Sequence, residues 1–219
     1  MTEATAPGRR LQIDVWADIG CPWCYLGETR LEKAIAESPH ADSIDLFLHS
    51  FELDPNLPAE PRPVPEYLAE RLGVTTEQVL RMESRMAEMA AEEGLPYRAE
   101  RPHANSFDVH RVVQFAAGYG LAPRLFHALQ LTLFGGAPDA YDHGRITEVA
   151  VEVGLDAARV REVLAGDEYA DAVRDDERQA AELGVTGVPF TVFDGRLALP
   201  GAASARDYAA VVARAWAGD

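Results

Sequence analysis

The patterns that predict β-strands lie near the two ends of this chain, and a long helical stretch separates them. Residues 11–16 alternate apolar and polar side chains, which is typical of a half-buried strand, and residues 44–51 predict a second strand. Residues 189–193 and 196–199 flank an Asp-Gly pair, which favours a hairpin with a two-residue turn. We therefore expect an α/β domain built from both chain ends and interrupted by a large all-helical insertion.

Helix signals divide the region between these strands. Pro22 opens an amphipathic pattern that ends at Ser38, because proline suits the first turn of a helix and Pro39 does not continue one. Prolines crowd residues 55–65, which predicts a linker. Thr75 and Gln78 have the spacing of a capping box. Further helices are expected to start near residues 105, 124, 142, 156, 168 and 204.

Met82, Met86 and Met89 form a stripe on the helix that follows the capping box. Flexible thioether side chains fill irregular gaps in protein cores, so the simplest interpretation is that they pack inside the insertion. The same stripe could instead cover a substrate groove. The sequence leaves both alternatives open.

Acidic residues outnumber basic ones along the whole chain. The 20 Lys and Arg residues against 36 Asp and Glu residues give a formal net charge of −16 at pH 7, which repels nucleic-acid phosphates and anionic lipid surfaces. The first fourteen residues lack the apolar run of a signal peptide, and no apolar run is long enough to span a bilayer. We therefore expect no nucleic-acid or membrane partner and a cytoplasmic location.

The clearest chemical feature is Cys21-Pro22-Trp23-Cys24, which lies where the first predicted strand gives way to the first helix. Residues i and i+3 share a helix face, so the two sulfurs can approach to disulfide range. Free N–H groups and the positive end of the helix dipole favour a thiolate on Cys21. We predict that Cys21 is the exposed nucleophile and Cys24 the resolving thiol, one turn deeper.

Other uses of the two cysteines fit less well. A zinc site needs two further ligands, and the histidines show no paired spacing of the finger type. An iron–sulfur cluster normally takes four thiolates, and a cysteine protease would leave Cys24 without a purpose. We expect no metal site, and chance adjacency of the cysteines is the remaining alternative.

Several segments together match the pattern of a known family. The Cys-Pro-Trp-Cys motif, the Gly-Val-Thr-Gly-Val-Pro-Phe run at residues 184–190 and the helical block between them resemble the DsbA family of thioredoxin-fold thiol-disulfide oxidoreductases. Residues 51–55, 105–111 and 200–202 are further similar to its cytoplasmic FrnE-like branch. That branch is related to 2-hydroxychromene-2-carboxylate isomerases and kappa-class glutathione transferases. The resemblance covers about residues 10–216.

The resemblance implies a thioredoxin-like domain made of residues 10–55 and 185–217, with a helical insertion domain at residues 56–184. It also implies that Cys21 attacks a substrate disulfide and that Cys24 resolves the mixed disulfide.

The resemblance also implies where a substrate binds. Pro189 would be a cis-proline that faces the dithiol, and Val188 would offer backbone groups to an extended substrate chain. Pro22 and Trp23 complete the expected substrate-binding residues. His110 and Arg111 match a recurring motif of the branch. A purely structural role for this pair is at least as good an interpretation as contact with substrate.

The function expected from these features is exchange of protein or peptide disulfides, as an oxidoreductase or disulfide isomerase. No metal or organic cofactor is required, and glutathione is a second candidate partner. A glutathione-dependent isomerase or transferase of small aromatic substrates is the first alternative, although those relatives usually carry Ser where this chain has Cys21. A redox-sensing binding or chaperone-like module is the second alternative. The direction of the redox reaction is not encoded in the motif spacing.

Overall fold

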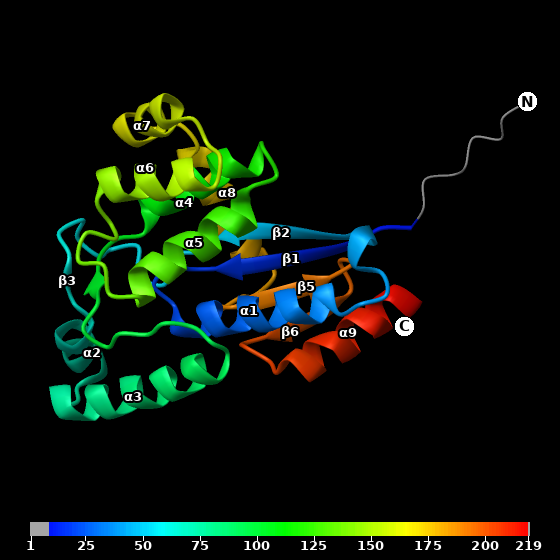
Figure 1. The fold of residues 1–219 in the computed structure, drawn as a ribbon, viewed down its shortest axis with the longest axis horizontal. Coiled ribbons are helices and arrows are strands. Elements are labelled where there is room, and N and C mark those ends of the chain that lie inside the picture. The colour runs from blue at the N-terminus through cyan, green and yellow to red at the C-terminus, as the bar shows by residue number, and fades with distance from the viewer. Residues whose placement is uncertain (1–8, 219) are drawn as a thin grey trace, which may run out of the picture.

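The sheet at the centre of the molecule joins the two ends of the chain, as predicted (Figure 1). The structure, a computed structural model, describes residues 9–218. In spatial order the strands are β2 (Ile44–Ser50), β1 (Leu11–Ala17), β5 (Phe190–Phe193) and β6 (Leu197–Pro200). β1 runs parallel to β2 and antiparallel to β5, and β6 is antiparallel to β5.

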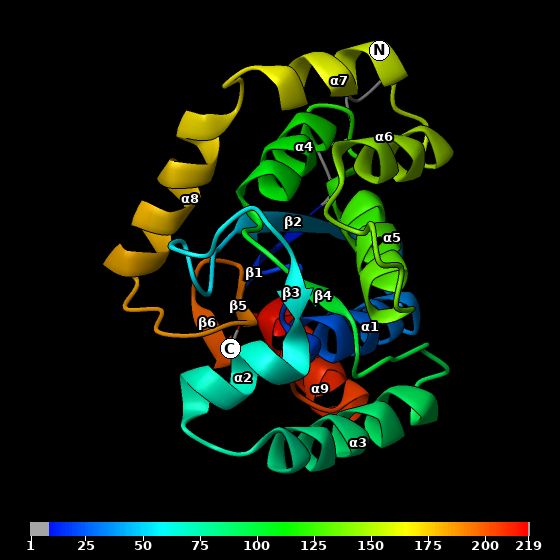
Figure 2. The same ribbon diagram turned by 90° about the vertical axis from the view of Figure 1, so that its left-hand side faces the viewer.

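Helices cover both faces of this sheet. They are α1 (Pro22–Ala36), α8 (Ala170–Glu182) and α9 (Ala205–Ala217), and Figure 2 shows the sheet between α8 on one side and α1 with α9 on the other. The prediction of a half-buried β1 is therefore wrong, because Asp14 and Trp16 are buried as well. The indole N–H of Trp16 donates to the Asp176 carbonyl oxygen of α8 at 3.1 Å, which explains why this face is not left to solvent.

The insertion forms two groups of helices on either side of the end of the sheet from which α1 starts (Figure 1). One group holds α2 and α3, and the other holds α4 to α7 together with α8. Their bounds are α2 (Val64–Leu72), α3 (Thr76–Glu92), α4 (Phe107–Ala117), α5 (Ala122–Phe134), α6 (His143–Glu152) and α7 (Ala157–Ala165). The domain boundaries given above stay predictions.

A small ribbon connects the two groups and corrects the expectation of an all-helical insertion. β3 (Arg62–Pro63) pairs antiparallel with β4 (Pro102–His103). The predicted linker also ends early, since α2 begins at Val64 and Pro65 occupies its first turn, where proline is tolerated. Strands of two residues are too short to show a period, which is why the sequence did not predict them.

Local signals located most other boundaries. Thr75 and Gln78 form the predicted capping box of α3. The β5–β6 hairpin differs in one respect, because three residues separate its paired ends and not two. Asp194 and Gly195 both have positive φ, and the Arg196 N–H closes their turn on the Phe193 carbonyl at 3.0 Å, so Arg196 falls outside the ladder.

Within residues 9–218 no helix has both the length and the apolar character needed to cross a membrane. Residues 1–8, on which the expected absence of a signal peptide partly depends, lie outside the described residues.

Candidate active site

The chain passes from β1 to α1 through Asp18-Ile19-Gly20, and Cys21 caps the helix. Cys21 has an extended backbone (φ −84°, ψ 113°), and its N–H donates to the Asp18 carbonyl oxygen at 3.1 Å. Pro22 occupies the first turn, where the helix needs no N–H donor and the fixed φ of proline fits. The local sequence therefore starts the helix at Pro22 and leaves Cys21 at its N-terminus.

The two cysteines lie close together as free thiols. Cys21 and Cys24 approach to 3.4 Å. Cys24 is fully buried, as its deeper position predicts, but Cys21 is also only 3% exposed. The prediction of an exposed Cys21 is wrong, because its thiol faces inward and donates a hydrogen bond to the Val188 carbonyl oxygen at 3.5 Å. Two cysteines this close can form a disulfide with little backbone movement.

The loop before β5 brings Val188 and Pro189 against α1. The Val188–Pro189 peptide bond is cis, as the resemblance implies. Gly27 permits this contact, since a Cβ added there would lie 3.1 Å from Cγ of Pro189. The expected substrate-binding residues Val188 and Pro189 are therefore beside the dithiol, and Trp23 is 45% exposed next to it.

A buried carboxyl group follows Cys24 by one turn of α1. Glu28 is buried, and its Oε1 has no hydrogen-bond partner among the described residues. Burial raises the pKa of Glu28 well above its ordinary value, and Glu32 and Cys21 raise it further. Burial also raises the pKa of Cys24, with added contributions from Cys21 and Glu28. Loss of a proton is therefore a substantial barrier to any reaction of Cys24.

A second buried carboxylate, that of Asp18, holds the loop in front of the dithiol. Its Oδ1 accepts the Gly20 N–H at 3.2 Å and its Oδ2 accepts the Leu53 N–H at 2.7 Å. Nε2 of His110 lies 3.7 Å from the same Oδ1. Burial alone would raise the pKa of Asp18, but His110 and the two N–H groups lower it below its usual value. Asp18 is thus an ionised anchor directly behind Cys21.

Glu52, which precedes Leu53, extends the polar contacts of Asp18 toward the insertion. It accepts hydrogen bonds from the Asn105 amide at 3.0 Å and from the Arg174 guanidinium at 2.6 Å. Glu52 and Leu53 belong to residues 51–55, and Asn105 and His110 to residues 105–111. Two segments that carry the resemblance to the FrnE-like branch therefore meet behind the Cys-Pro-Trp-Cys loop, although they are far apart in sequence.

Comparison with known proteins agrees with this geometry. The family model of the DSBA-like thioredoxin domain matches residues 12–213, nearly the whole chain. The chain belongs to this family.

Three relatives indicate how similar this DSBA-like protein is to known chains. The structure of the probable DsbA oxidoreductase SCO1869 from Streptomyces coelicolor is 40% identical, with a TM-score of 0.91, and the match covers 96% of this chain and 92% of that one. Uncharacterized protein YwbO of Bacillus subtilis is 28% identical over 88% of this chain and 91% of its own length. Cytosolic disulfide reductase DsbM from Pseudomonas aeruginosa has 18% identity and a TM-score of 0.64, covering 95% and 100%. This last similarity shows the fold alone.

Sequence reasoning assigned no role to Asp18, Glu28 or Glu52 in this DSBA-like protein. A signal existed for Glu28, because it follows Cys24 at i+4 and so shares its helix face. No local signal existed for the contacts of Asp18 with Leu53 and His110 or for those of Glu52 with Asn105 and Arg174, because these partners are distant in sequence.

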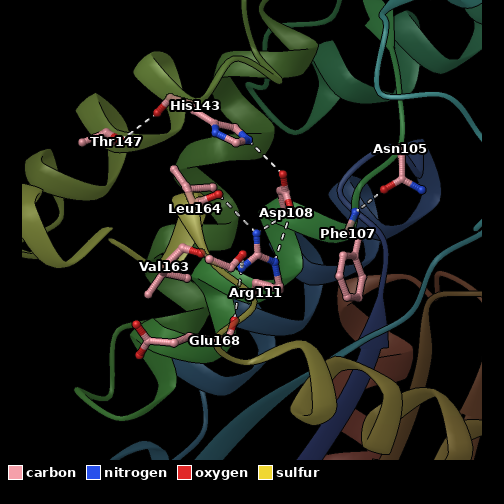
Figure 3. Close-up of polar contacts among 10 residues, drawn as sticks. Asn105, Phe107, Asp108, Arg111, His143, Thr147, Val163, Leu164 and Glu168 are labelled. Atoms are coloured by element: carbon pink, nitrogen blue, oxygen red, sulfur yellow. Dashed lines mark hydrogen bonds and ion pairs between the residues drawn. The ribbon is translucent and has the colours of Figure 1, made fainter. Parts of the chain in front are cut away.

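Arg111 is a structural residue of the insertion (Figure 3). Its guanidinium donates to backbone carbonyl oxygens after and within α7, including that of Gly166 at 2.9 Å, and to Oδ1 of Asp108 at 2.7 Å. Asp108 in turn binds Nε2 of His143 at 2.8 Å. The structural interpretation therefore holds for Arg111, whereas its neighbour His110 lies beside Asp18 at the dithiol loop.

A cavity of about 540 Å³ opens beside the motif of the DSBA-like protein. Gly20, Pro22 and Trp23 form one wall, and α2 and α3 form the others. The methionine stripe lines this cavity, with Met86 buried and Met82 48% exposed. Both interpretations of the stripe hold in part, because Met86 and Met89 pack with Leu26 and Ala90 in a small core cluster, and the same face of α3 also borders the open cavity.

Proposed function

We propose that this chain is a thiol-disulfide oxidoreductase that works through the Cys21–Cys24 dithiol. The observation that supports this proposal is the approach of the two free thiols to 3.4 Å at the start of α1. Helix N-termini favour thiolates, and the first cysteine of the pair faces the Val188 carbonyl oxygen. Family membership supports the same chemistry.

The reaction has two balanced steps. The Cys21 thiolate attacks one sulfur of a substrate disulfide, which forms a mixed disulfide and releases the other substrate sulfur as a thiolate. The Cys24 thiolate then attacks Sγ of Cys21, which releases the reduced substrate and leaves a Cys21–Cys24 disulfide. In the reducing direction, an external dithiol or two molecules of a monothiol return the protein to its dithiol form and leave as a disulfide. Each step runs backwards in the oxidising direction.

In its ionised form, Glu28 is the group that accepts the Cys24 proton before the second step. A carboxylate one turn away on the same helix face can take the proton, and burial has raised the pKa of Glu28 toward that of a useful base. The proton returns to Cys24 when an external thiol reduces the disulfide. Asp18 and His110 take no part in the proton transfer and position the loop that carries Cys21.

Val188 and Pro189 form the side of the site against which the substrate chain lies. The half-exposed Val188 sits before β5 beside Cys21, so an extended peptide can add to this segment as a strand would. Pro22 and Trp23 border the other side of Cys21.

Glutathione is a candidate electron donor for the same dithiol. DsbM, a structural neighbour named as a cytosolic disulfide reductase, has also been solved with GSH. We extend this to the present chain as a proposal, together with a cytoplasmic location, where a reduced thiol pool would regenerate the dithiol. No metal or organic cofactor enters the proposed steps.

The test is turnover of a model protein disulfide with dithiothreitol or glutathione as donor. Wild type should turn over, Cys21→Ser should be inactive, and Cys24→Ser should accumulate a mixed disulfide with the substrate that mass spectrometry detects. Turnover that persists in Cys21→Ser would contradict the proposal.

Two other outcomes would replace this function with another. A glutathione-dependent isomerisation or transfer that survives in Cys24→Ser, with no disulfide turnover in wild type, would favour the isomerase or transferase alternative. Holdase activity without disulfide turnover would favour the chaperone-like module.

A further inference from the structure

The cavity beside Trp23 borders Gly20 and Pro22, the two residues that flank Cys21, and the two-step exchange does not use it. We infer that it is a specificity subsite that binds the apolar side chain of a peptide substrate next to the reacting cysteine, with an acidic residue of the same peptide at its rim. The inference rests on the proposed function and adds to it a class of substrate.

The position of the cavity follows from the neighbours of Cys21. Gly20 and Pro22, which flank Cys21 in sequence, both line it, and Val188 contacts the Cys21 thiol from the loop before β5. The reactive sulfur therefore lies between Val188 and the cavity. A peptide that adds its backbone at Val188 and presents a cysteine to Cys21 continues toward the cavity, so a flanking side chain reaches it.

The walls of the cavity select apolar groups. Trp23, Leu53, Leu72 and Met82 are large apolar side chains that stay exposed to solvent in the structure, and all four line this one cavity. An apolar surface of this extent marks a binding site more often than an accident of packing. The volume of about 540 Å³ exceeds what one aliphatic side chain needs and lies within the range of about 300–1,000 Å³ for ligand sites.

The methionines make this subsite tolerant of shape. Met82, Met86 and Met89 come from one face of α3, and unbranched thioether side chains adapt to different apolar partners. We therefore expect the subsite to accept Phe, Leu or Met with similar preference and to discriminate against small polar side chains.

The rim of the cavity carries one unneutralised positive charge. Arg71 pairs with Asp54 at 2.6 Å, and the buried Arg101 pairs with Glu83 at 2.5 Å. Arg85 is exposed on the rim and has no ion-pair partner within residues 9–218. In a chain with a net charge of −16, a free guanidinium at an apolar cavity favours an acidic group on the ligand.

The test uses glutathione mixed disulfides of short capped peptides that contain one cysteine. Each peptide carries Phe or Ser next to the cysteine and Glu or Gln two residues beyond that position, which gives four peptides. Each of the four is made in two versions, with these residues either before or after the cysteine. Glutathione disulfide is the control substrate, because it has no apolar side chain that could bind in the cavity. With dithiothreitol as the external thiol, the rate of release of reduced peptide, followed by chromatography, gives kcat/KM.

Wild type should prefer the Phe peptide over the Ser peptide by about tenfold or more on one side of the cysteine, which corresponds to partial burial of one aromatic side chain. Met82→Gln and Leu72→Gln should remove this preference and leave turnover of the Ser peptide and of glutathione disulfide unchanged. Val151→Gln is the matched control, since Val151 is equally exposed on α6 and does not line the cavity. Arg85→Gln should remove the preference for Glu over Gln only.

Each other outcome is informative. Equal turnover of Phe and Ser peptides by wild type, or an unchanged Phe preference in both cavity variants, overturns the subsite and leaves the proposed function standing. Inhibition by a small aromatic carboxylate without any peptide preference assigns the cavity to a small molecule and also overturns it. Failure of wild type to reduce any substrate, glutathione disulfide included, removes the proposed function and the subsite together.

Discussion

Nε2 of His110 lies 3.7 Å from Oδ1 of Asp18, and both side chains are buried behind the loop that leads into Cys21. The Asp18 carboxylate holds Gly20, and the Asp18 carbonyl oxygen accepts the N–H of Cys21. A residue of the helical insertion therefore faces Asp18, the aspartate after β1 whose own hydrogen bonds hold the loop of the nucleophile.

The first prediction concerns this pair. His110→Gln should lower the free energy of unfolding by about 2 kcal/mol, because a buried carboxylate loses a partner that faces it. It should also speed alkylation of Cys21 by up to about tenfold, because a loosened loop uncovers a thiol that is only 3% exposed. Denaturant unfolding and iodoacetamide kinetics measure the two effects. His143→Gln is the control, since His143 pairs with Asp108 at an exposed site and should change stability by less than about 1 kcal/mol. Equal effects of the two variants would contradict the role assigned to His110.

The second prediction concerns the buried carboxyl group behind Cys24. Glu28→Gln should slow resolution of the mixed disulfide by about a hundredfold, because Cys24 loses its proton acceptor, while the first attack by Cys21 changes little. Single-turnover kinetics with a substrate that leaves a detectable mixed disulfide separates the two steps. Glu37→Gln, at the exposed C-terminal end of α1, is the control and should leave both steps unchanged.

Although Glu28→Gln should slow the reaction, it should increase the stability of the fold. The folded-state pKa of Glu28 is raised by burial, so the folded protein holds a proton that the unfolded chain releases above its ordinary pKa of about 4.3. Wild type therefore loses stability as pH rises from that value toward the folded-state pKa. Glu28→Gln should remove this loss and be more stable than wild type at neutral pH. A variant that is both slower and less stable would count against a Glu28 whose pKa is raised by burial.

The third prediction concerns the contact between α8 and the sheet. Burial alone would lower the pKa of His49, but hydrogen bonds to Asp14 and Asp176 raise it to about 9. A raised folded-state pKa stabilises the protein fully below the ordinary value of about 6.5, and this stabilisation is lost as pH rises through about 9. The rise in the pKa of His49 from about 6.5 to about 9 corresponds to about 3 kcal/mol in the free energy of unfolding.

Urea unfolding between pH 6 and pH 10 measures this effect. Wild type should lose stability steadily above pH 7, and His49→Gln should start lower and show a flatter profile. His40→Gln is the control, because His40 stacks on Trp216 and forms no ion pair with a carboxylate of residues 9–218. A profile for His49→Gln as steep as that of wild type would assign the pH dependence to other groups.

The parts of the site that could be predicted depend on neighbours in sequence. The i, i+3 spacing located Cys21 and Cys24 on one face of α1, and the Thr75–Gln78 box located the start of α3. The burial of Cys21 could not be predicted, because the Val188 carbonyl that covers it comes from the other end of the chain. The same holds for Asp18 and His110, whose contact exists only once α4 has packed against the sheet.

What the methionine stripe contacts could not be predicted from the sequence, for a related reason. Helical spacing shows that Met82, Met86 and Met89 share a face, but it does not show whether that face meets another helix or an open cavity. In the structure α3 stands away from α4 to α7 and faces the start of α1 (Figure 2). The identity of the partner element decides between core and groove, and no local pattern encodes it.

The last prediction concerns the close approach of Gly27 to Pro189. A methyl group at Gly27 would lie 3.1 Å from Cγ of Pro189 and 3.3 Å from both Cβ of Ala202 and the hydroxyl of Tyr208. Gly27→Ala should therefore cost about 1–3 kcal/mol of stability through overpacking. It should also lower the rate of disulfide exchange, since the Pro189 loop must move away from the helix that carries Cys21. Gly144→Ala on α6 is the matched control, because no contact within 4 Å is found for the added methyl group in the described part of the chain, and helix propensity there predicts a gain of up to about 1 kcal/mol. Thermal unfolding and turnover of both variants test this, and a gain in stability for Gly27→Ala would show that the Pro189 loop accommodates the methyl group without cost.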